Sequence, residues 1–234
     1  MKQTMEKQNV ELASGVIRFL QLCSALCAQL LRESITKEKL DSLRAARELF
    51  LEEPFCSLAP RSANRLHDIL SEDADKELLS DLRKDYTYLF IVVAQSQVSP
   101  YESVYRTMDN TLFGPSTLKL RKLMREFGLG LPQDISEPDD HIAIEFAFLA
   151  ELLSRLADSC EGIVPGSKDS EVMVDGIKRL LAEHLLGFAP MYLERLAQRS
   201  RTIFYQELAY FALATLRATG KYFAVKAEYE VMWN

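Results

Sequence analysis

The fold is decided by one stretch of the sequence, EPDDHIAIEFAFLAELLSRLA at residues 137–157. Its apolar residues recur at intervals of three and four, the spacing of a core-facing stripe on an α-helix. The stripe consists of Ile142, Phe146, Leu149, Leu153 and Leu156. Because Ile144 and Phe148 fall outside this stripe, the helix is apolar on more than one side. We therefore predict a buried helix over 142–157 that runs through the middle of an all-α domain.

The residues just before this helix are acids, a proline and a histidine. Pro138 suits a first helical turn, since its missing N–H would have no partner there. The carboxylates of Glu137, Asp139 and Asp140 oppose the positive end of the helix dipole. Neither effect explains His141, which makes the start of this helix a candidate functional position.

Length and composition limit the class of protein. The chain has 234 residues, 48% of them apolar, enough for a core in one large domain or two small lobes. Its four cysteines follow no disulfide or metal-binding spacing, which favours reduced thiols in a cytoplasm. The net charge of −6 argues against a nucleic-acid surface and favours a basic partner. The apolar run Phe19–Leu31 is shorter than the about 20 residues of a membrane span, so we interpret it as a core helix.

Helical periodicity and capping residues predict helices along the whole chain, and no alternating pattern is long enough for a strand. The other predicted helices cover 10–33, 37–51, 61–70, 73–93, 101–112, 116–127, 169–186, 190–198 and 202–219. Gly128 is predicted to end the helix 116–127, and Pro190 to lie in a first turn. The predicted fold is a single irregular bundle of about nine to eleven helices. Two lobes, about 1–128 and 142–234, are expected to meet at a hinge over about 129–141.

Catalytic and metal-binding patterns are weak. The stretch 162–168 is one residue short of a phosphate loop and no strand precedes it, so we expect no nucleotide site there. His67, His141 and His184 have no ligand partner at helical spacing, so no metal is expected. Asp140 and His141 are adjacent, and adjacent helical residues point about 100° apart, a poor geometry for a catalytic dyad. We expect a binding protein without a cofactor; an enzyme or nucleotide hydrolase is the weaker alternative.

Aromatic residues gather next to breaks in the helical pattern. Tyr86, Leu89 and Phe90 share a helix face through their i, i+3, i+4 spacing, and Tyr101 and Tyr105 follow the next loop. Core packing is the default for each ring taken singly. Together with the acidic helix start, however, the rings fit a groove for an apolar peptide with a basic end.

Five short motifs carry a family resemblance. They are DYTYLF at 85–90, PYESVY at 100–105, LFG at 112–114, MREFG at 124–128 and EPDDH at 137–141. In this order and spacing they resemble the TorD/DmsD family of redox-enzyme maturation chaperones. The resemblance implies an all-helical cytoplasmic protein that binds the twin-arginine leader of a molybdenum-containing reductase of the dimethyl sulfoxide reductase type. Such a chaperone delays export of the precursor until its cofactor is loaded. By analogy with the related nitrate-reductase assembly factors, the alternative is recognition of the folded catalytic subunit.

The resemblance also implies a set of leader-binding residues. They are Tyr86, Leu89, Phe90, Pro100, Tyr101, Asp140 and His141, with Glu137 in the same hinge motif. Two features depart from the most similar members, which carry tryptophan at positions 86 and 101 and Gly-Pro in place of Val92-Val93. We expect apolar leader side chains to bury against the aromatic face, and carboxylates to orient the arginines. The chain is expected to be a monomer or homodimer that binds no nucleic acid and does not insert into a membrane.

Overall fold

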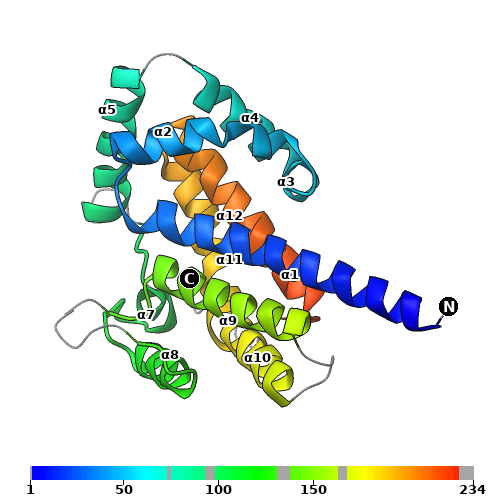
Figure 1. Cartoon of the computed structure of the whole chain (residues 1–234). Coiled ribbons are helices and arrows are strands. Elements are labelled where there is room, and N and C mark those ends of the chain that lie inside the picture. The colour runs from blue at the N-terminus through cyan, green and yellow to red at the C-terminus, as the bar shows by residue number, and fades with distance from the viewer. Residues whose placement is uncertain (1, 73–74, 93–97, 131–137, 163–167, 227–234) are drawn as a thin grey trace.

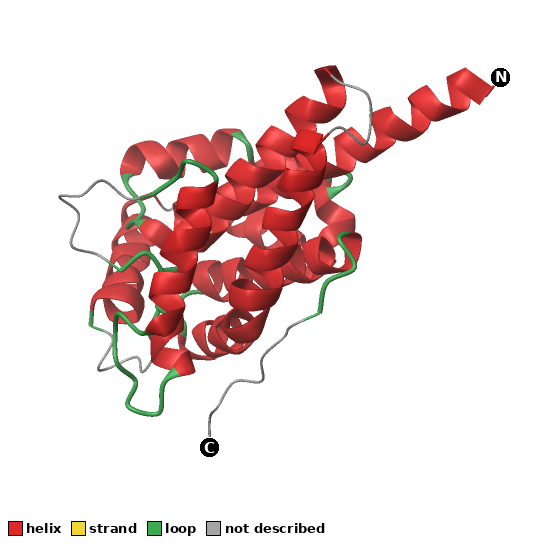
Figure 2. Cartoon of the chain, turned by 90° about the horizontal axis from the view of Figure 1, so that it is seen from below, coloured by secondary structure: helices red, strands yellow, loops and turns green. Residues whose placement is uncertain are grey.

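The computed structural model describes residues 2–72, 75–92, 98–130, 138–162 and 168–226. These residues form about ten helices and no strand (Figure 2), so the predicted all-α bundle is confirmed. The central part of the predicted hinge, residues 131–137, lies outside the described residues. The division into two lobes therefore stays a prediction.

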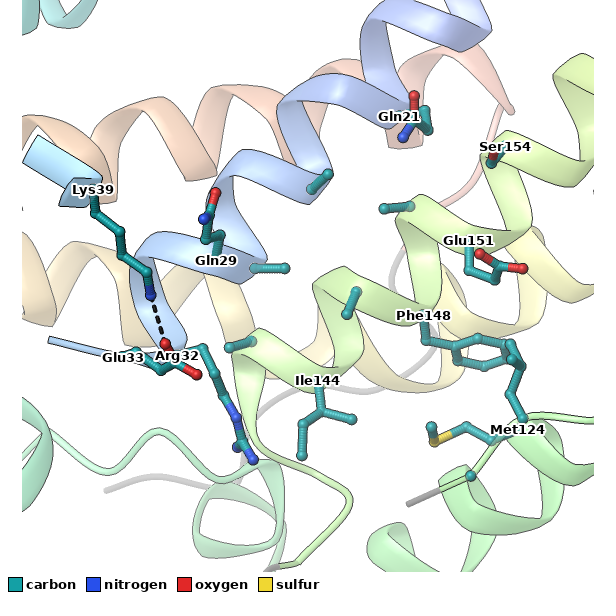
Figure 3. Close-up of a pocket in the computed structure, with 17 residues that line it drawn as sticks. Gln21, Gln29, Arg32, Glu33, Lys39, Met124, Ile144, Phe148, Glu151 and Ser154 are labelled. Atoms are coloured by element: carbon teal, nitrogen blue, oxygen red, sulfur yellow. Dashed lines mark hydrogen bonds and ion pairs between the residues drawn. The ribbon is translucent and has the colours of Figure 1, made fainter. Parts of the chain in front are cut away.

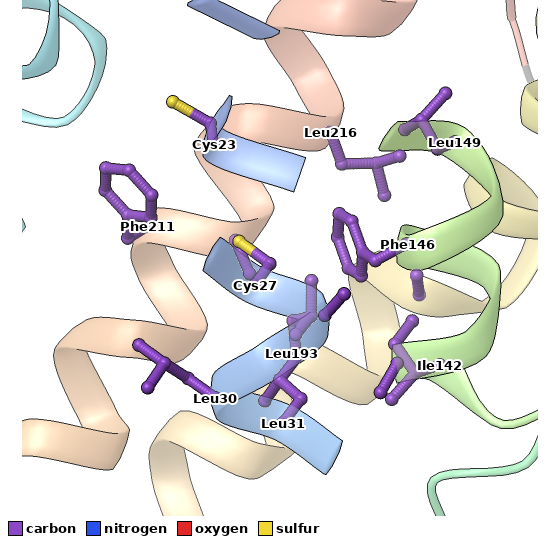
Figure 4. Close-up of a cluster of buried hydrophobic side chains, with 14 of the residues drawn as sticks. Cys23, Cys27, Leu30, Leu31, Ile142, Phe146, Leu149, Leu193, Phe211 and Leu216 are labelled. Atoms are coloured by element: carbon purple, nitrogen blue, oxygen red, sulfur yellow. The ribbon is translucent and has the colours of Figure 1, made fainter. Parts of the chain in front are cut away.

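Four helices form the centre of the molecule. α1 (Lys2–Arg32) packs along α9 (Ile142–Gly162) and α12 (Ile203–Tyr222), and α12 packs in turn on α11 (Leu186–Arg199) (Figure 1). Side chains from these four helices meet in one apolar cluster (Figure 4). The buried central helix is confirmed, since Ile144 and Phe148 are buried together with the main stripe. One strip of α9, at Ala147 and Glu151, is left exposed.

The first helix contains the apolar run that the sequence assigns to the core. Ala13–Arg32 is long and apolar enough to cross a membrane, but half of this segment is buried inside the bundle. Leu20, Cys23, Cys27 and Leu31 are almost fully buried. The interpretation of Phe19–Leu31 as part of a core helix is therefore confirmed.

Short helices cover one end of the central group. They are α2 (Lys37–Ala45), the 3₁₀ turn η1 (Arg47–Leu51), α3 (Phe55–Leu58), α4 (Pro60–Ser71), α5 (Asp75–Tyr86) and the π-helical turn η2 (Thr87–Ile91). The predicted helix 37–51 is thus divided at Ala46. Thr36 caps α2 by accepting a hydrogen bond from the backbone N–H of Lys39, at 3.2 Å. The predicted helix 73–93 continues from α5 into η2, which carries Leu89 and Phe90.

The remaining elements are α7 (Glu102–Arg106), α8 (Pro115–Glu126), α10 (Lys168–Arg179) and the π-helical turn η3 (Leu180–Leu185), which leads directly into α11. Two of the sequence predictions in this part of the chain differ from the structure. The predicted helix 101–112 ends at Arg106, and Asn110 and Phe113 adopt positive φ. Gly128 has φ +69° after α8, as predicted.

The prediction that Pro190 begins a helix is wrong, because α10, η3 and α11 follow one another without a break and Pro190 lies inside α11. An interior proline costs a helix about 3 kcal/mol. Phe188, Tyr192 and Leu193 on the same helix are fully buried, and their burial offsets that cost. A widened π turn just ahead of the proline also eases its fit.

Candidate functional site

The two strongest sequence motifs lie side by side in the structure. The chain before α7 runs antiparallel to the chain before α9, and Tyr101 pairs with His141. The N–H of Ile142 donates to the carbonyl of Pro100 at 2.8 Å, and the N–H of Glu102 donates to the carbonyl of Asp140 at 2.9 Å. The rings of Tyr101 and His141 meet edge to face, with centroids 5.2 Å apart. Residues about 40 apart in sequence are thus joined at one point.

The acidic residues and the histidine cap helices at this point. One carboxylate oxygen of Asp140 accepts a hydrogen bond from the N–H of Ser103 in the first turn of α7, at 2.7 Å. His141 Nδ1 accepts one from the N–H of Ala143 in the first turn of α9, at 3.1 Å. The carboxylate of Asp139 is paired with Arg121 of α8. Asp139 and Asp140 are buried, so these two carboxylates are not exposed to a leader as the sequence analysis expected. Glu137 lies outside the described residues.

His141 is neutral in this environment. Burial, and then the positive charge of Arg32, lowers the pKa of His141 to about 3. With the single proton of the neutral imidazole on Nε2, Nδ1 accepts the hydrogen bond that caps α9. Asp140 uses its carboxylate to cap a different helix, and the two side chains do not form an acid–base dyad.

The aromatic residues of the first motif are packed into the body of the molecule. Tyr86 stacks on Phe90 with ring centroids 4.7 Å apart, so their predicted common face is confirmed, and Tyr205 lies against both rings. The hydroxyl of Tyr86 donates to the carbonyl of Arg32, at the end of α1, at 2.7 Å. Tyr86 and Phe90 are each 8% exposed and Leu89 is fully buried, so these residues do not form an open trough.

Pro100 and Tyr101 differ in accessibility. Pro100 is buried, whereas Tyr101 is half-buried. Of the seven described residues in the predicted leader-binding set, Tyr101 is thus the one whose side chain is substantially accessible to solvent.

The motif residues fix the ends of the two helices that border a cavity. Tyr86 holds the end of α1 through Arg32, and His141 holds the start of α9 through Ala143. Between α1 and α9 lies a cavity of about 800 Å³ (Figure 3), a volume typical of ligand-binding clefts. We call it the α1–α9 groove. The alanines that line it are Ala25, Ala28, Ala143, Ala147 and Ala150, and its larger apolar residues are Ile144, Phe148, Met124 and Leu129.

Polar side chains stand near both ends of the α1–α9 groove (Figure 3). Arg32, Glu33 and Lys39 lie at one end, and Lys39 pairs with Glu33. Glu151 lies toward the other end and pairs with Arg155 at 2.7 Å. Exposed ion pairs of this kind contribute only about 0–1 kcal/mol. Both carboxylates are therefore available to exchange their present partners for a cation on a ligand.

Sequence reasoning missed two features of this site. One is Asp85, whose carboxylate accepts hydrogen bonds from the N–H of Arg201 and from the N–H and hydroxyl of Thr202, and so fixes the start of α12. No local pattern shows this, since the partners are more than 110 residues away. The other is the set of alanines along the groove. Their spacing at 143, 147 and 150 is visible in the sequence and marks one face of α9.

A buried polar cluster joins α7 to η3 behind the motifs. Glu102 accepts a hydrogen bond from His184 at 2.8 Å and from Arg106 at 2.9 Å, and all three side chains are largely buried. Glu145 of α9 lies close to this cluster and is fully buried. Burial, followed by the nearby carboxylates of Glu102 and Asp140, raises the pKa of Glu145, which keeps this side chain neutral. In the part of the chain that the structure describes, no three His, Cys, Asp or Glu side chains are grouped to hold a metal ion.

Comparisons with known proteins place these motifs in a wider context. Residues 53–194 match the model of a protein family described as nitrate reductase delta subunit. Over 194 residues, 79% of this chain and 83% of the relative, the sequence is 28% identical to the chaperone protein TorD of Shewanella loihica. It is 32% identical to TorD of Vibrio cholerae over 66% of this chain and 64% of that protein. It is also 28% identical to the probable Tat proofreading chaperone DmsD of Haemophilus influenzae, over 65% of this chain and 67% of that protein.

Proposed function

We propose that this chain, which belongs to the family described as nitrate reductase delta subunit, is a cytoplasmic chaperone that binds the twin-arginine leader of a molybdenum-containing reductase precursor. The resemblance to the TorD/DmsD chaperones is confirmed by the relatives of those names. The α1–α9 groove is the observation that carries the proposal, because the motif residues fix its two helices.

The apolar segment of the leader is the part that fits this groove. The exposed Ala147 and the other alanines leave room for a peptide backbone to approach α1 and α9 closely. Ile144, Phe148 and Met124 line the groove with only their edges accessible, each less than 10% exposed. Each Å² of apolar surface removed from water contributes about 25 cal/mol. Ordering a disordered leader costs roughly 2–5 kcal/mol. Binding of this kind is reversible, as release of the precursor for export requires.

The basic end of the leader is proposed to meet a carboxylate at one end of the groove, either Glu33 or Glu151. Glu33 and Glu151 hold their lysine and arginine partners in exposed pairs, which leader arginines can replace. Such contacts add orientation and association rate more than affinity.

Within the proposal, the motif residues act mainly by holding the groove. Tyr86, stacked on Phe90, supports the end of α1, and Asp140 and His141 set the starts of α7 and α9. Leu89 is buried next to Phe90 in η2. Pro100 positions the half-buried Tyr101, which is the motif side chain placed to touch a leader directly. Glu137 stays in the proposed set through its motif alone. The role is binding rather than catalysis.

Isothermal titration with a synthetic twin-arginine leader tests this proposal. Binding at about 10 μM is expected, a concentration at which a useful Kd is measurable. Ala147→Phe fills the floor of the groove, so we expect it to weaken binding by about tenfold or more. The exposed Ala45 lies on α2 and does not line the groove, and Ala45→Phe should bind as the unmodified chain does. Unchanged leader affinity in a folded Ala147→Phe variant contradicts the proposed site.

The family description favours a second candidate, recognition of a folded reductase subunit. Binding of the mature enzyme without its leader, together with no heat from the leader alone, supports that function. The two measurements give opposite results for the two candidates.

A further inference from the structure

Large apolar side chains are exposed in the loop between α7 and α8 and near the start of α8. Met108 is 85% exposed, Phe113 54% and Leu118 63%, with Leu112 beside them in sequence and also exposed. Clustered exposed apolar groups mark interaction surfaces, whereas single ones are ordinary. We use the name α7–α8 patch for Met108, Leu112, Phe113, Leu118, Lys122 and Arg125.

The loop that carries the patch has a defined conformation. The N–H of Thr111 donates to the side-chain oxygen of Thr107 at 3.1 Å, and the N–H of Asn110 donates to its carbonyl at 3.3 Å. Phe113 has φ +59°, a conformation that a bulky residue rarely adopts. Its ring is nonetheless more than half exposed, so core packing does not offset this strain. A strained and exposed phenylalanine is better explained by a contact outside the chain.

The outer face of α8 adds positive charge next to the apolar side chains. Leu118, Lys122 and Arg125 follow one another at i, i+4 and i+7, and all three are exposed. Two acids lie nearby: Glu126 pairs with Arg179 at 2.6 Å and also interacts with the charge of Lys122, and the loop contributes Asp109. The net charge of the whole chain is −6. The patch therefore has the opposite sign to the molecule and complements an anionic surface.

We propose that the α7–α8 patch docks this protein onto an anionic lipid surface. Protruding apolar side chains enter the boundary between headgroups and acyl chains, and the cations meet lipid phosphates. The exposed fractions show that Met108, Phe113 and Leu118 protrude rather than line a cleft. A lipid surface needs no matching pocket, in contrast to a folded protein partner, and this difference favours lipid.

The orientation of α8 is compatible with a loaded groove. Met124 lines the α1–α9 groove from the inner face of α8, opposite the patch. Docking through the outer face leaves the groove open, and α8 lies at the edge of the molecule (Figure 1). Docking on lipid through this face is therefore independent of a leader in the groove.

Co-sedimentation of the full chain with vesicles tests the proposal. The chain should sediment with vesicles of phosphatidylcholine and phosphatidylglycerol, and not with phosphatidylcholine alone. Binding should weaken between low and high salt, because the exposed cations are screened. A chain that stays in the supernatant with both kinds of vesicle overturns the proposal, including the case in which it binds a soluble acidic protein instead. Equal binding to both vesicles also overturns it.

Matched variants locate the surface. Lys122→Gln with Arg125→Gln should weaken vesicle binding by about fivefold for each charge removed, and Met108→Ser with Leu118→Ser should weaken it further. Lys76→Gln on α5 and Val172→Ser on α10 change exposed side chains elsewhere and should leave binding unchanged. Thermal melting checks that every variant is folded. Equal losses in the patch and control variants contradict the assignment of this surface.

Discussion

His141 shows how a single residue of the strongest motif works in this fold. Its neutral ring accepts the first-turn N–H of Ala143, and its pKa is lowered to about 3 by burial and by Arg32. On unfolding below pH 6.5 the imidazole gains a proton that the folded form excludes. The neutral ring of His141 therefore carries no protonation cost above pH 6.5. Below that pH the free energy of unfolding falls, and the loss continues until the pH reaches the folded pKa of about 3.

Urea unfolding at pH 7 and pH 5 measures this contribution. His141 should account for roughly 2 kcal/mol of the stability lost between these pH values. This follows because pH 5 lies about 1.5 units below the histidine pKa of the unfolded chain, and each unit corresponds to about 1.4 kcal/mol. His141→Asn offers a capping acceptor that does not titrate, so this part of the loss should be absent. His67→Asn, which changes a histidine far from the site, should lose stability as the unmodified chain does. The same pH dependence in His141→Asn would show that the ring is not held neutral.

For single residues, the sequence singles out candidate positions, but it does not show the contacts that each side chain makes. Tyr86, Asp140 and His141 stand out by type and spacing, and the structure brings them to the ends of α1, α7 and α9. Their burial was not predictable. It depends on partners such as Arg32 and Tyr205, which are distant in the sequence.

Asp85 of α5 caps the start of a different helix, α12. Helix α12 begins at Ile203, and the carboxylate of Asp85, at the end of α5, accepts three kinds of hydrogen bond from Arg201 and Thr202 just before it. The side chain is 1% exposed. It therefore ties the aromatic motif to the start of a core helix.

Removing this cap should destabilise the fold measurably. Asp85→Ala removes a buried, charged acceptor from the N–H groups of Arg201 and Thr202, and a loss of about 2–3 kcal/mol in the free energy of unfolding is expected. Asp81 is one turn earlier on α5 and only forms an exposed pair with Lys84, so Asp81→Ala should cost less than about 0.5 kcal/mol. Urea denaturation of the two variants makes the comparison. Similar small effects would mean that α12 does not depend on Asp85.

The helices were predictable wherever apolar spacing and caps agreed. The start of α2 after Thr36, the end of α8 before Gly128 and the buried course of α9 follow from local residues. The helix through Pro190 was not, because the burial of Phe188 and Tyr192 overrides the local signal of the proline. The loop after Arg106 was mistaken for helix, since positive φ at Asn110 and Phe113 leaves no trace in the apolar pattern.

In the whole molecule, the α1–α9 groove lies next to the family motifs, and none of the described residues of the predicted leader-binding set lines it. The sequence predicts an aromatic groove beside an acidic helix start. The structure buries Tyr86, Phe90, Asp139 and Asp140, while the α1–α9 groove is accessible. Only tertiary packing of α1 on α9, which are more than 100 residues apart, creates this cavity. Spacing within either helix alone does not reveal it.

Photo-crosslinking of a bound leader tests the central claim most directly. A synthetic twin-arginine leader with benzoylphenylalanine in its apolar segment is irradiated with the full chain, and the crosslinked peptides are identified by mass spectrometry. Crosslinks to 21–32 of α1 and 143–154 of α9, which include the residues that line the groove, are expected. Crosslinks confined to other surfaces, such as α8 or α10, would place the leader elsewhere and contradict the account.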